Sequence, residues 1–300
     1  MPEIGRLLTA MVTPFDAAGR VDYARARQLA EALVASGSDG LVVAGTTGEA
    51  PTLTHDEKLR LFSEVREAVG DRAAIIAGTC NYNTAESIEL SREAARLGVT
   101  GILGTVPYYN KPPQEGLYQH FKAIAEAVPL PLILYNVPSR TVTNLLPETA
   151  VRLSAIDNIV GIKEASGNLE AIAQIIEGAG PDFRVWSGND ADTLPILAIG
   201  GYGVVRVTGH LVGRQIQQMI TSYLAGDVTT AATLHRRLLP ITQACFVTTS
   251  PIPLKYALQR VGFPVGSLRP PLLWIDERSA AVVDAALART TIDLPIPAKA

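Results

Sequence analysis

The sequence predicts the α/β class, and within it a (β/α)8 TIM barrel with a C-terminal helical extension. Eight short apolar runs rich in Val, Ile and Leu alternate with helical patterns, as expected for parallel strands that are covered on both faces. Eight such units within about 225 residues approach the ~250 residues typical of this barrel. An open doubly wound sheet rarely has eight equal units, and no Gly-x-Gly-x-x-Gly motif follows the first run.

The strands are expected at the apolar runs. In chain order these are residues 7–13, 40–46, 73–79, 101–106, 131–136, 159–163, 184–187 and 203–207. In such a barrel the chemistry takes place at the C-terminal ends of the strands. The ends of these runs are therefore where functional residues are expected.

Helices are expected between the strands, and several have recognisable starts. Thr54 with Glu57 three residues later is a capping box, and Asn83 with Glu86 follows the same logic. A third helix is expected over residues 168–178. The first of these helices has an apolar face made by Leu59, Phe62, Val65 and Val69.

The last part of the chain lacks the strand alternation. We therefore expect a catalytic barrel over residues 1–225 and a C-terminal helical domain over residues 226–300. One helix of this extension is expected over residues 276–289. Its apolar stripe is expected to consist of Val282, Val283, Ala286 and Leu287.

The composition excludes several classes of protein. With 300 residues, 47% of them hydrophobic and 18% charged, the chain is too apolar to be disordered. No apolar run reaches the ~18 residues of a membrane span, and a net charge of −3 argues against a nucleic-acid partner. The N-terminus shows no signal peptide, so a cytoplasmic protein with Cys80 and Cys245 as reduced thiols is expected.

The expected sixth strand carries the first candidate for chemistry, Lys163. Side chains alternate along a strand, so Ile159, Gly161 and Lys163 are expected to share the face toward the barrel interior. Val160 and Ile162 would then face the helices. None of the other five lysines lies in a strand-like run; they are Lys58, Lys111, Lys122, Lys255 and Lys299.

Two interpretations of Lys163 stay open at this point. A lysine at a strand end often extends to solvent or pairs with an acid. Alternatively, it is a Schiff-base nucleophile, which requires an uncharged amine. Desolvation at a barrel mouth lowers the pKa of a lysine by about three pH units, which makes such an amine available.

Tyr135 ends the neighbouring strand. Adjacent strands lie about 4.8 Å apart, so its hydroxyl can reach a carbonyl compound attached to Lys163 and exchange a proton with it. The alternative is an aromatic side chain that only fills the core.

At the end of the second strand, the glycines of Gly45–Glu49 let the backbone approach a ligand, and the hydroxyls of Thr46 and Thr47 can donate to a carboxylate. A simple tight turn is the alternative for this segment.

Arg140 follows the fifth strand, and its planar guanidinium suits a second carboxylate, although a loop arginine is often only a surface residue. Tyr108 and Tyr109 end the fourth strand and form a packing pair or supply a further phenol. No metal site is expected, because the four histidines are scattered and show no metal-binding spacing; they are His55, His120, His210 and His235.

Taken together, four motifs resemble the dihydrodipicolinate synthase family, in the N-acetylneuraminate lyase group of class I aldolases. They are Gly45-Thr46-Thr47-Gly48-Glu49, Tyr108-Tyr109-Asn110-Lys111-Pro112, Tyr135-Asn136-Val137-Pro138-Ser139-Arg140-Thr141 and Gly161-Ile162-Lys163-Glu164-Ala165-Ser166. Their order and spacing follow the family from about residue 7 to the C-terminal helices. The Arg140 loop favours this member over its sister lyases.

The resemblance implies a reaction and a role for each residue. Lys163 would form an imine with pyruvate, and the enamine would add to aspartate semialdehyde to give 4-hydroxy-tetrahydrodipicolinate, in lysine and diaminopimelate biosynthesis. The resemblance further implies no cofactor, because the imine is the electron sink, and a homotetramer built as a dimer of dimers. In the implied site, Thr46 and Thr47 bind the pyruvate carboxylate, and Arg140 binds the aldehyde substrate. A proton relay consists of Tyr135, Thr46 and a neighbouring subunit's Tyr109. Gly45 and the Val205 carbonyl line the site.

Two departures from the family pattern bear on function. Arg206 stands where the family usually has a small hydroxyl residue, and His210 where it has asparagine; an inward Arg206 would alter the choice of carbonyl substrate. The feedback site for lysine that the resemblance implies at the dimer interface also differs. It aligns with His55, Lys58, Tyr82, Glu86 and Tyr108, of which Lys58 and Tyr82 replace a histidine and an asparagine. An ammonium group there disfavours a cationic ligand, so weak or absent inhibition by lysine is expected.

Two alternative functions stay open on the sequence. One is a sister aldolase, lyase or dehydratase acting on 2-keto-3-deoxy sugar acids or on sialic acid, which would need Lys163 and Tyr135 but no clamp at Arg140. The other is a catalytically inactive barrel that senses pyruvate. No feature of the sequence favours the second, because the lysine, tyrosine and threonine set is complete.

Overall fold

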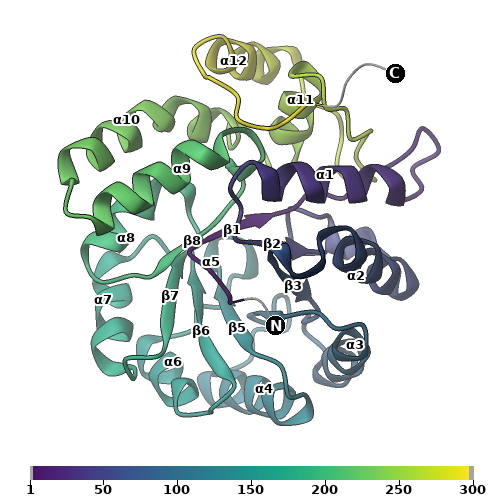
Figure 1. Ribbon diagram of the computed structural model, residues 1–300. Coiled ribbons are helices and arrows are strands. Elements are labelled where there is room, and N and C mark those ends of the chain that lie inside the picture. Colours follow the sequence, from purple (N-terminus) through teal and green to yellow (C-terminus); the bar gives the residue numbers. More distant parts are fainter. Residues whose placement is uncertain (1–2, 297–300) are drawn as a thin grey trace.

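The eight apolar runs form one closed sheet of parallel strands, in chain order and with β1 paired to β8 (Figure 1). The structure is a computed structural model and describes residues 3–296, so Lys299 lies outside the described part. The strands are β1 (Leu7–Ala10), β2 (Gly40–Val43), β3 (Ala74–Gly78), β4 (Gly101–Thr105), β5 (Leu132–Asn136), β6 (Ile159–Glu164), β7 (Arg184–Ser187) and β8 (Gly203–Arg206). Every predicted strand is confirmed, with ends shifted by at most a few residues.

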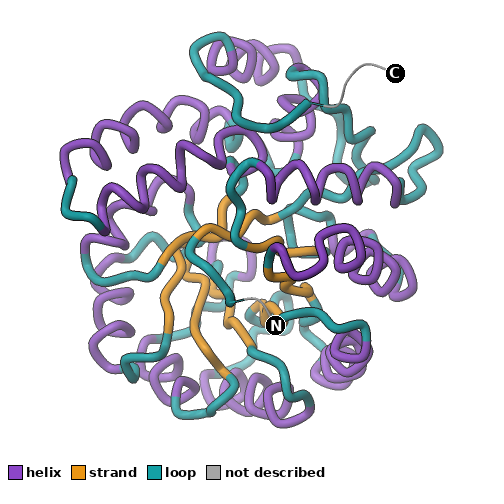
Figure 2. Tube along the Cα trace, viewed as in Figure 1, coloured by secondary structure: helices purple, strands orange, loops and turns teal. Residues whose placement is uncertain are grey.

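Helices surround the strands as an outer layer, which Figure 2 shows in purple around the orange barrel. They are α1 (Tyr23–Ala35), α2 (His55–Val69), α3 (Thr84–Arg96), α4 (Gln114–Ala127), α5 (Pro138–Thr141), α6 (Pro147–Ser154), α7 (Leu169–Gly178), α8 (Thr193–Ala198), α9 (Gly209–Leu224), α10 (Val228–Ala244), α11 (Ile252–Arg260) and α12 (Glu277–Leu287). Within residues 3–296, three 3₁₀ turns accompany them: η1 (Ala50–Thr52), η2 (Gly70–Arg72) and η3 (Asp190–Asp192). The barrel with C-terminal helices is the predicted fold.

The predicted helix starts are confirmed by their caps. Thr54 and Glu57 form the capping box of α2, and Asn83 and Asn168 cap α3 and α7 with their side chains. On α12 the prediction that Val282 belongs to the apolar stripe is wrong. Val282 is 43% exposed, because the helix turns only Val283 and Ala286 fully inward.

The predicted alternation along β6 is correct at its end and wrong at its start. The pairing of β5 with β6 shifts between Leu132 and Ile133, so that Ile133 lies opposite Gly161. This irregularity turns Ile159 outward into the helix-facing core and brings Val160 to the interior cluster. From Gly161 onward the alternation is regular, which leaves Lys163 on the interior side.

The interior of the barrel is filled by side chains rather than open. Trp186 is fully buried there, together with Leu8, Ile76 and Ile133. A Cβ atom on Gly161 would lie 2.6 Å from the Trp186 ring and 2.1 Å from the carbonyl oxygen of Arg184. Glycine is therefore required at this position, two residues before Lys163.

The C-terminal segment returns to the start of the chain. Helices α11 and α12, yellow-green and yellow in Figure 1, lie outside the ring of barrel helices. The backbone N–H of Phe15 donates to the carbonyl of Val265 at 3.0 Å. The Arg269 side chain donates to the carbonyls of Gly19 and Thr52, at 2.8 and 2.7 Å. The extension thus contacts the segments on either side of β2.

Two further features concern the described residues 3–296 as a whole. None of their helices is both long and apolar enough to cross a membrane. Cys80 and Cys245 are both free thiols, and burial raises the pKa of each; for Cys80 the pKa is about 12.

Candidate active site

Lys163 and Tyr135 lie side by side at the C-terminal ends of β6 and β5. Their Cα atoms are partners in the strand register, and the Lys163 Nζ lies 4.0 Å from the centroid of the Tyr135 ring. Both side chains are buried, at 7% and 5% exposure. A cation over a phenol face is attracted to it, so the ring holds the amine in place while the strands fix both residues.

The surroundings of Lys163 make its amine available as a nucleophile. Burial lowers the pKa of Lys163 to about 8, against an opposing effect of the Asp190 carboxylate and with help from the Arg140 guanidinium. At neutral pH roughly a tenth of the amine is then uncharged, whereas an ordinary lysine has well under a thousandth. The other interpretation of Lys163, a strand-end lysine that extends to solvent, is incompatible with this burial.

Tyr135 connects the buried lysine to the turn that follows β2. Burial raises the pKa of the Tyr135 hydroxyl to about 12, opposed by the charge of Arg140 and by a hydrogen bond with the Thr46 side chain. The phenol is therefore protonated at neutral pH. It can give a proton to a developing oxyanion and take one back through Thr46.

The turn after β2 is held in a strained backbone conformation. Ala44 and Glu49 have φ values of +52° and +57°, in the left-handed region that non-glycine residues rarely adopt. The Glu49 N–H donates to the Thr46 carbonyl at 3.0 Å, and the Thr13 hydroxyl donates to the Gly48 carbonyl at 2.6 Å. These contacts fix the backbone of the turn that carries Thr46 and Thr47.

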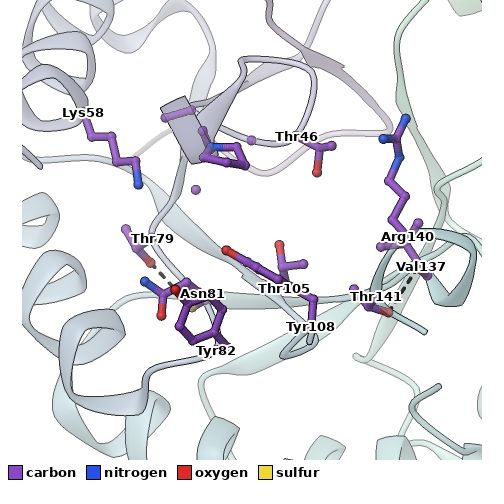
Figure 3. A pocket seen from close by; sticks show the side chains of 16 residues that line it. Thr46, Lys58, Thr79, Asn81, Tyr82, Thr105, Tyr108, Val137, Arg140 and Thr141 are labelled. Carbon is purple, nitrogen blue, oxygen red and sulfur yellow. Dashed lines mark hydrogen bonds between the residues drawn. The ribbon is translucent and has the colours of Figure 1, made fainter. Parts of the chain in front are cut away.

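A pocket of about 500 Å³ lies at this end of the barrel. Gly45, Thr46 and Arg140 line one part of it, and Lys58 and Tyr82 line another. Figure 3 shows Thr46 and Arg140 on one side and Lys58 on the opposite side of the space, with Tyr108 between them. The volume suits a small polar substrate.

Arg140 lies in the short helix α5, directly after β5. Its backbone N–H donates to the Val137 carbonyl at 2.9 Å, and its side chain is free to extend into the pocket. Its charge lowers the pKa of both Lys163 and Tyr135. Arg140 therefore combines two functions: it can bind a carboxylate, and it favours the uncharged amine.

Tyr108 and Tyr109 separate in the structure. Tyr108 lines the pocket and packs edge-to-face on Tyr82, with ring centroids 5.0 Å apart. Tyr109 has φ +73° and is 88% exposed, so it points away from the pocket of its own chain. This geometry is compatible with donation to another subunit, as the family resemblance implies.

The residues aligned with a lysine effector site are only partly together. Lys58, Tyr82 and Tyr108 line the pocket, and burial lowers the pKa of Lys58 against the nearby Glu86. His55 instead turns to Glu93, with 2.5 Å between its Nε2 and the carboxylate. The Glu86 carboxylate accepts from the Asn81 and Asn83 side chains.

Arg206 lies on β8 and points away from the interior of the barrel. Val205 faces the barrel interior, so Arg206 points outward, where it is 2% exposed. Its Nε donates to Asp190 at 3.2 Å and an Nη donates to the Thr242 hydroxyl of α10 at 2.9 Å. Arg206 thus has no access to a substrate in the barrel mouth.

His210 is also a structural residue. Its Nε2 accepts from the Val12 N–H at 3.2 Å, and its Nδ1 donates to the Val207 carbonyl at 2.8 Å. Burial lowers its pKa to about 4, so the ring is neutral. It ties the segment after β8 to the segment after β1.

Several residues near the site were not predicted from the sequence. Asp190 accepts hydrogen bonds from Val207 and Thr208 and acts on Lys163 through its charge. Lys255 is fully buried and paired with Glu49, although it lies in a helix. Both contacts join residues that are distant in the sequence, so no local pattern signals them.

Lys255 is the second buried lysine whose pKa burial lowers to about 8. Its Nζ lies 2.6 Å from a Glu49 carboxylate oxygen and donates to the Ser267 carbonyl at 2.8 Å. The Lys255 amine is therefore already engaged in an ion pair and a hydrogen bond within the protein. Lys163 differs because it lies at a strand end beside Tyr135, so its position singles it out. Across residues 3–296 no group of three or more His, Cys, Asp or Glu side chains is arranged to hold a metal ion.

The chain is similar to known proteins over nearly its full length. Residues 3–290 match the model of the dihydrodipicolinate synthetase family. The 4-hydroxy-tetrahydrodipicolinate synthase of Dehalococcoides mccartyi is 58% identical over 296 residues, which is 99% of this chain and 100% of that protein.

Solved structures give the same result. The enzyme from Cyanidioschyzon merolae with lysine bound has a TM-score of 0.94 at 46% identity, covering 95% of this chain and 98% of that one. The chloride-inhibited dihydrodipicolinate synthase from Acinetobacter baumannii, complexed with pyruvate, has a TM-score of 0.93 at 39% identity, covering 96% and 99%. The chain therefore belongs to the dihydrodipicolinate synthetase family.

Proposed function

We propose that this chain catalyses the condensation of pyruvate with L-aspartate 4-semialdehyde to 4-hydroxy-tetrahydrodipicolinate through a Schiff base on Lys163. The activity itself is that of the full-length relatives and of the family. The observation that carries the mechanism is the buried Lys163 amine, with its pKa lowered to about 8, in register with Tyr135.

The first half of the reaction activates pyruvate. The uncharged Lys163 amine adds to the ketone carbon, Tyr135 protonates the oxygen, and loss of water leaves an iminium ion. Thr46 and Thr47 hold the pyruvate carboxylate through their hydroxyl and backbone donors, with Gly45 and the Val205 carbonyl lining the site. Removal of a methyl proton then gives an enamine. The C–H electron pair forms the new carbon–carbon double bond, and the iminium nitrogen accepts the electron pair of the former C=N π bond.

The second half forms the new carbon–carbon bond. The enamine carbon attacks the aldehyde carbon of aspartate semialdehyde, and the aldehyde oxygen takes a proton through Tyr135 and Thr46. The guanidinium of Arg140 binds the carboxylate of this substrate. The substrate amine then attacks the iminium carbon and displaces Lys163, which closes the ring and regenerates the enzyme.

Assembly completes the site in this proposal. Tyr109 of one subunit joins the proton relay of its neighbour, which is supported by its 88% exposure and left-handed backbone. The assembly is a homotetramer built as a dimer of dimers, located in the cytoplasm. Inhibition by lysine is weak, because Lys58 brings an ammonium group into the pocket that would receive this cation.

A coupled assay of pyruvate with a set of aldehydes tests the proposed substrate. The proposal predicts a kcat/KM for aspartate semialdehyde far above that for the aldehydes derived from 2-keto-3-deoxy sugar acids or sialic acid. Arg206, which would have favoured another substrate by pointing inward, is bound to Asp190 outside the barrel mouth. A preference for a sugar-derived aldehyde would overturn the proposal in favour of the sister enzymes.

A further inference from the structure

Glu49 ends the turn that carries Thr46 and Thr47, and its own backbone is strained. At φ +57° a glutamate lies in the left-handed region, where its Cβ is crowded by the backbone and which residues other than glycine rarely adopt. Its N–H nevertheless closes the turn by donating to the Thr46 carbonyl, and the Ala50 N–H donates to the Gly45 carbonyl at 3.2 Å. Something outside the turn must therefore hold Glu49 in this conformation.

The Glu49 side chain is held by the C-terminal extension. Its carboxylate lies 2.6 Å from the Nζ of Lys255 on α11, and the two side chains are 1% and 0% exposed. The other carboxylate oxygen accepts from the backbone N–H of Arg269 at 3.0 Å. Both contacts come from the segment that folds back from α11 toward the start of the chain.

Lys255 is fixed in turn by its own contacts. Its Nζ donates to the Ser267 carbonyl at 2.8 Å and lies 4.2 Å from the centroid of the Phe15 ring. A buried ion pair is a weak source of stability, because the desolvation of two charges offsets their attraction. Its main physical effect is directional: it fixes where the Glu49 carboxylate lies, and with it the turn.

We propose that Glu49 and Lys255 are a positioning pair for the reaction: the extension holds the turn after β2 so that Thr46 and Thr47 face pyruvate. The inference rests on the proposed role of these two threonines. Neither Glu49 nor Lys255 touches substrate. Loss of the pair would let the strained turn relax and would move the threonine hydroxyls away from the pyruvate carboxylate.

The test separates positioning from stability through three variants. Lys255→Met and Glu49→Gln each leave one buried partner unpaired, and both are expected to lower the melting temperature. Glu49→Gln/Lys255→Met leaves no unpaired charge and is expected to recover most of that loss. Arg260→Met is the matched control, because it removes an exposed ion pair with Asp284 from the same helix.

The readout is the KM for pyruvate, measured beside the KM for aspartate semialdehyde and the melting temperature. In the double variant the KM for pyruvate is expected to stay raised roughly tenfold or more, with a smaller change for the aldehyde, since small displacements of binding groups have large kinetic effects. If the KM for pyruvate returns to the wild-type value together with the melting temperature, the pair is only structural and the inference is wrong.

Two further points make the outcome decisive. If the single variants do not fold, the double variant alone decides between the two results. Trapping of the wild-type enzyme with pyruvate and borohydride tests Lys163 separately. A wild-type enzyme labelled at Lys163, with an unchanged KM in the double variant, would refute the positioning pair and leave the proposed function intact.

Discussion

Lys163 and Tyr135 are register partners on β6 and β5, with the lysine Nζ 4.0 Å from the centroid of the phenol ring. The same burial acts on both groups in opposite directions: it lowers the pKa of Lys163 to about 8 and raises that of Tyr135 to about 12. Near neutral pH the pair therefore offers an uncharged amine beside a protonated phenol. Imine formation needs this combination of nucleophile and acid.

The pH dependence of the enzyme follows from Lys163. Because burial lowers the pKa of its amine to about 8, the reactive uncharged form increases as the pH rises through this value. We expect kcat/KM for pyruvate to increase up to about pH 8 and then to level off. A profile that continues to rise toward pH 10, the range of an ordinary lysine, would contradict the desolvated amine.

Replacement of Arg140 by alanine is expected to have two effects. The KM for aspartate semialdehyde should rise between roughly tenfold and a hundredfold, because a charge-assisted contact to its carboxylate is lost. The acid limb of the pH profile should also move to higher pH, because Arg140 lowers the pKa of Lys163.

Arg152→Ala is the matched control for Arg140. Arg152 lies on α6 in an exposed ion pair with Glu115, outside the pocket. It should change neither the KM nor the pH profile. An Arg140→Ala enzyme with wild-type kinetics for aspartate semialdehyde would refute the assigned role.

Replacement of Arg206 by methionine is expected to affect stability rather than specificity. Asp190 would lose its buried guanidinium partner and keep only its bonds to Val207 and Thr208. We expect the free energy of unfolding in urea to fall by roughly 3 kcal/mol, the lower end for a broken buried pair. The ranking of aldehyde substrates should stay as in the wild type, and a new preferred aldehyde would show that Arg206 reaches the substrate.

Feedback by lysine is expected to be weak. A free lysine entering the pocket near Tyr82 and Tyr108 would meet the ammonium of Lys58, which repels its positive charge. Lys58→His, which restores the residue of the family pattern, should strengthen inhibition. Inhibition curves of both proteins provide the measurement, and half-maximal inhibition of the wild type by submillimolar lysine would contradict this expectation.

The fold and the position of Lys163 could be predicted because their signals are local. Strand-like runs, capping residues and alternation along β6 each depend on residues a few positions apart, and they correctly placed the barrel and Lys163. Alternation failed at Ile159 and Val160, where the register shift beside Leu132 has no mark in the sequence. The division of the chain at residues 225 and 226 stays a prediction.

The contacts that were missed connect distant parts of the chain. Whether Arg206 points inward depends on Asp190 and on Thr242 of α10. The burial of Lys255 depends on the return of the extension to Glu49. Such pairs are fixed by tertiary packing, so no spacing within the sequence reports them. The sequence alone therefore left the direction of Arg206 open and gave Lys255 no role.

Borohydride reduction in the presence of pyruvate, followed by peptide mass mapping, tests the Schiff base on Lys163 most directly. Lys255 is the internal control, because burial lowers its pKa to the same value of about 8. We expect one reduced pyruvate per chain, on the peptide that contains Lys163, and no label in Lys163→Ala. Label on Lys255, or label that persists in Lys163→Ala, would contradict the proposed mechanism.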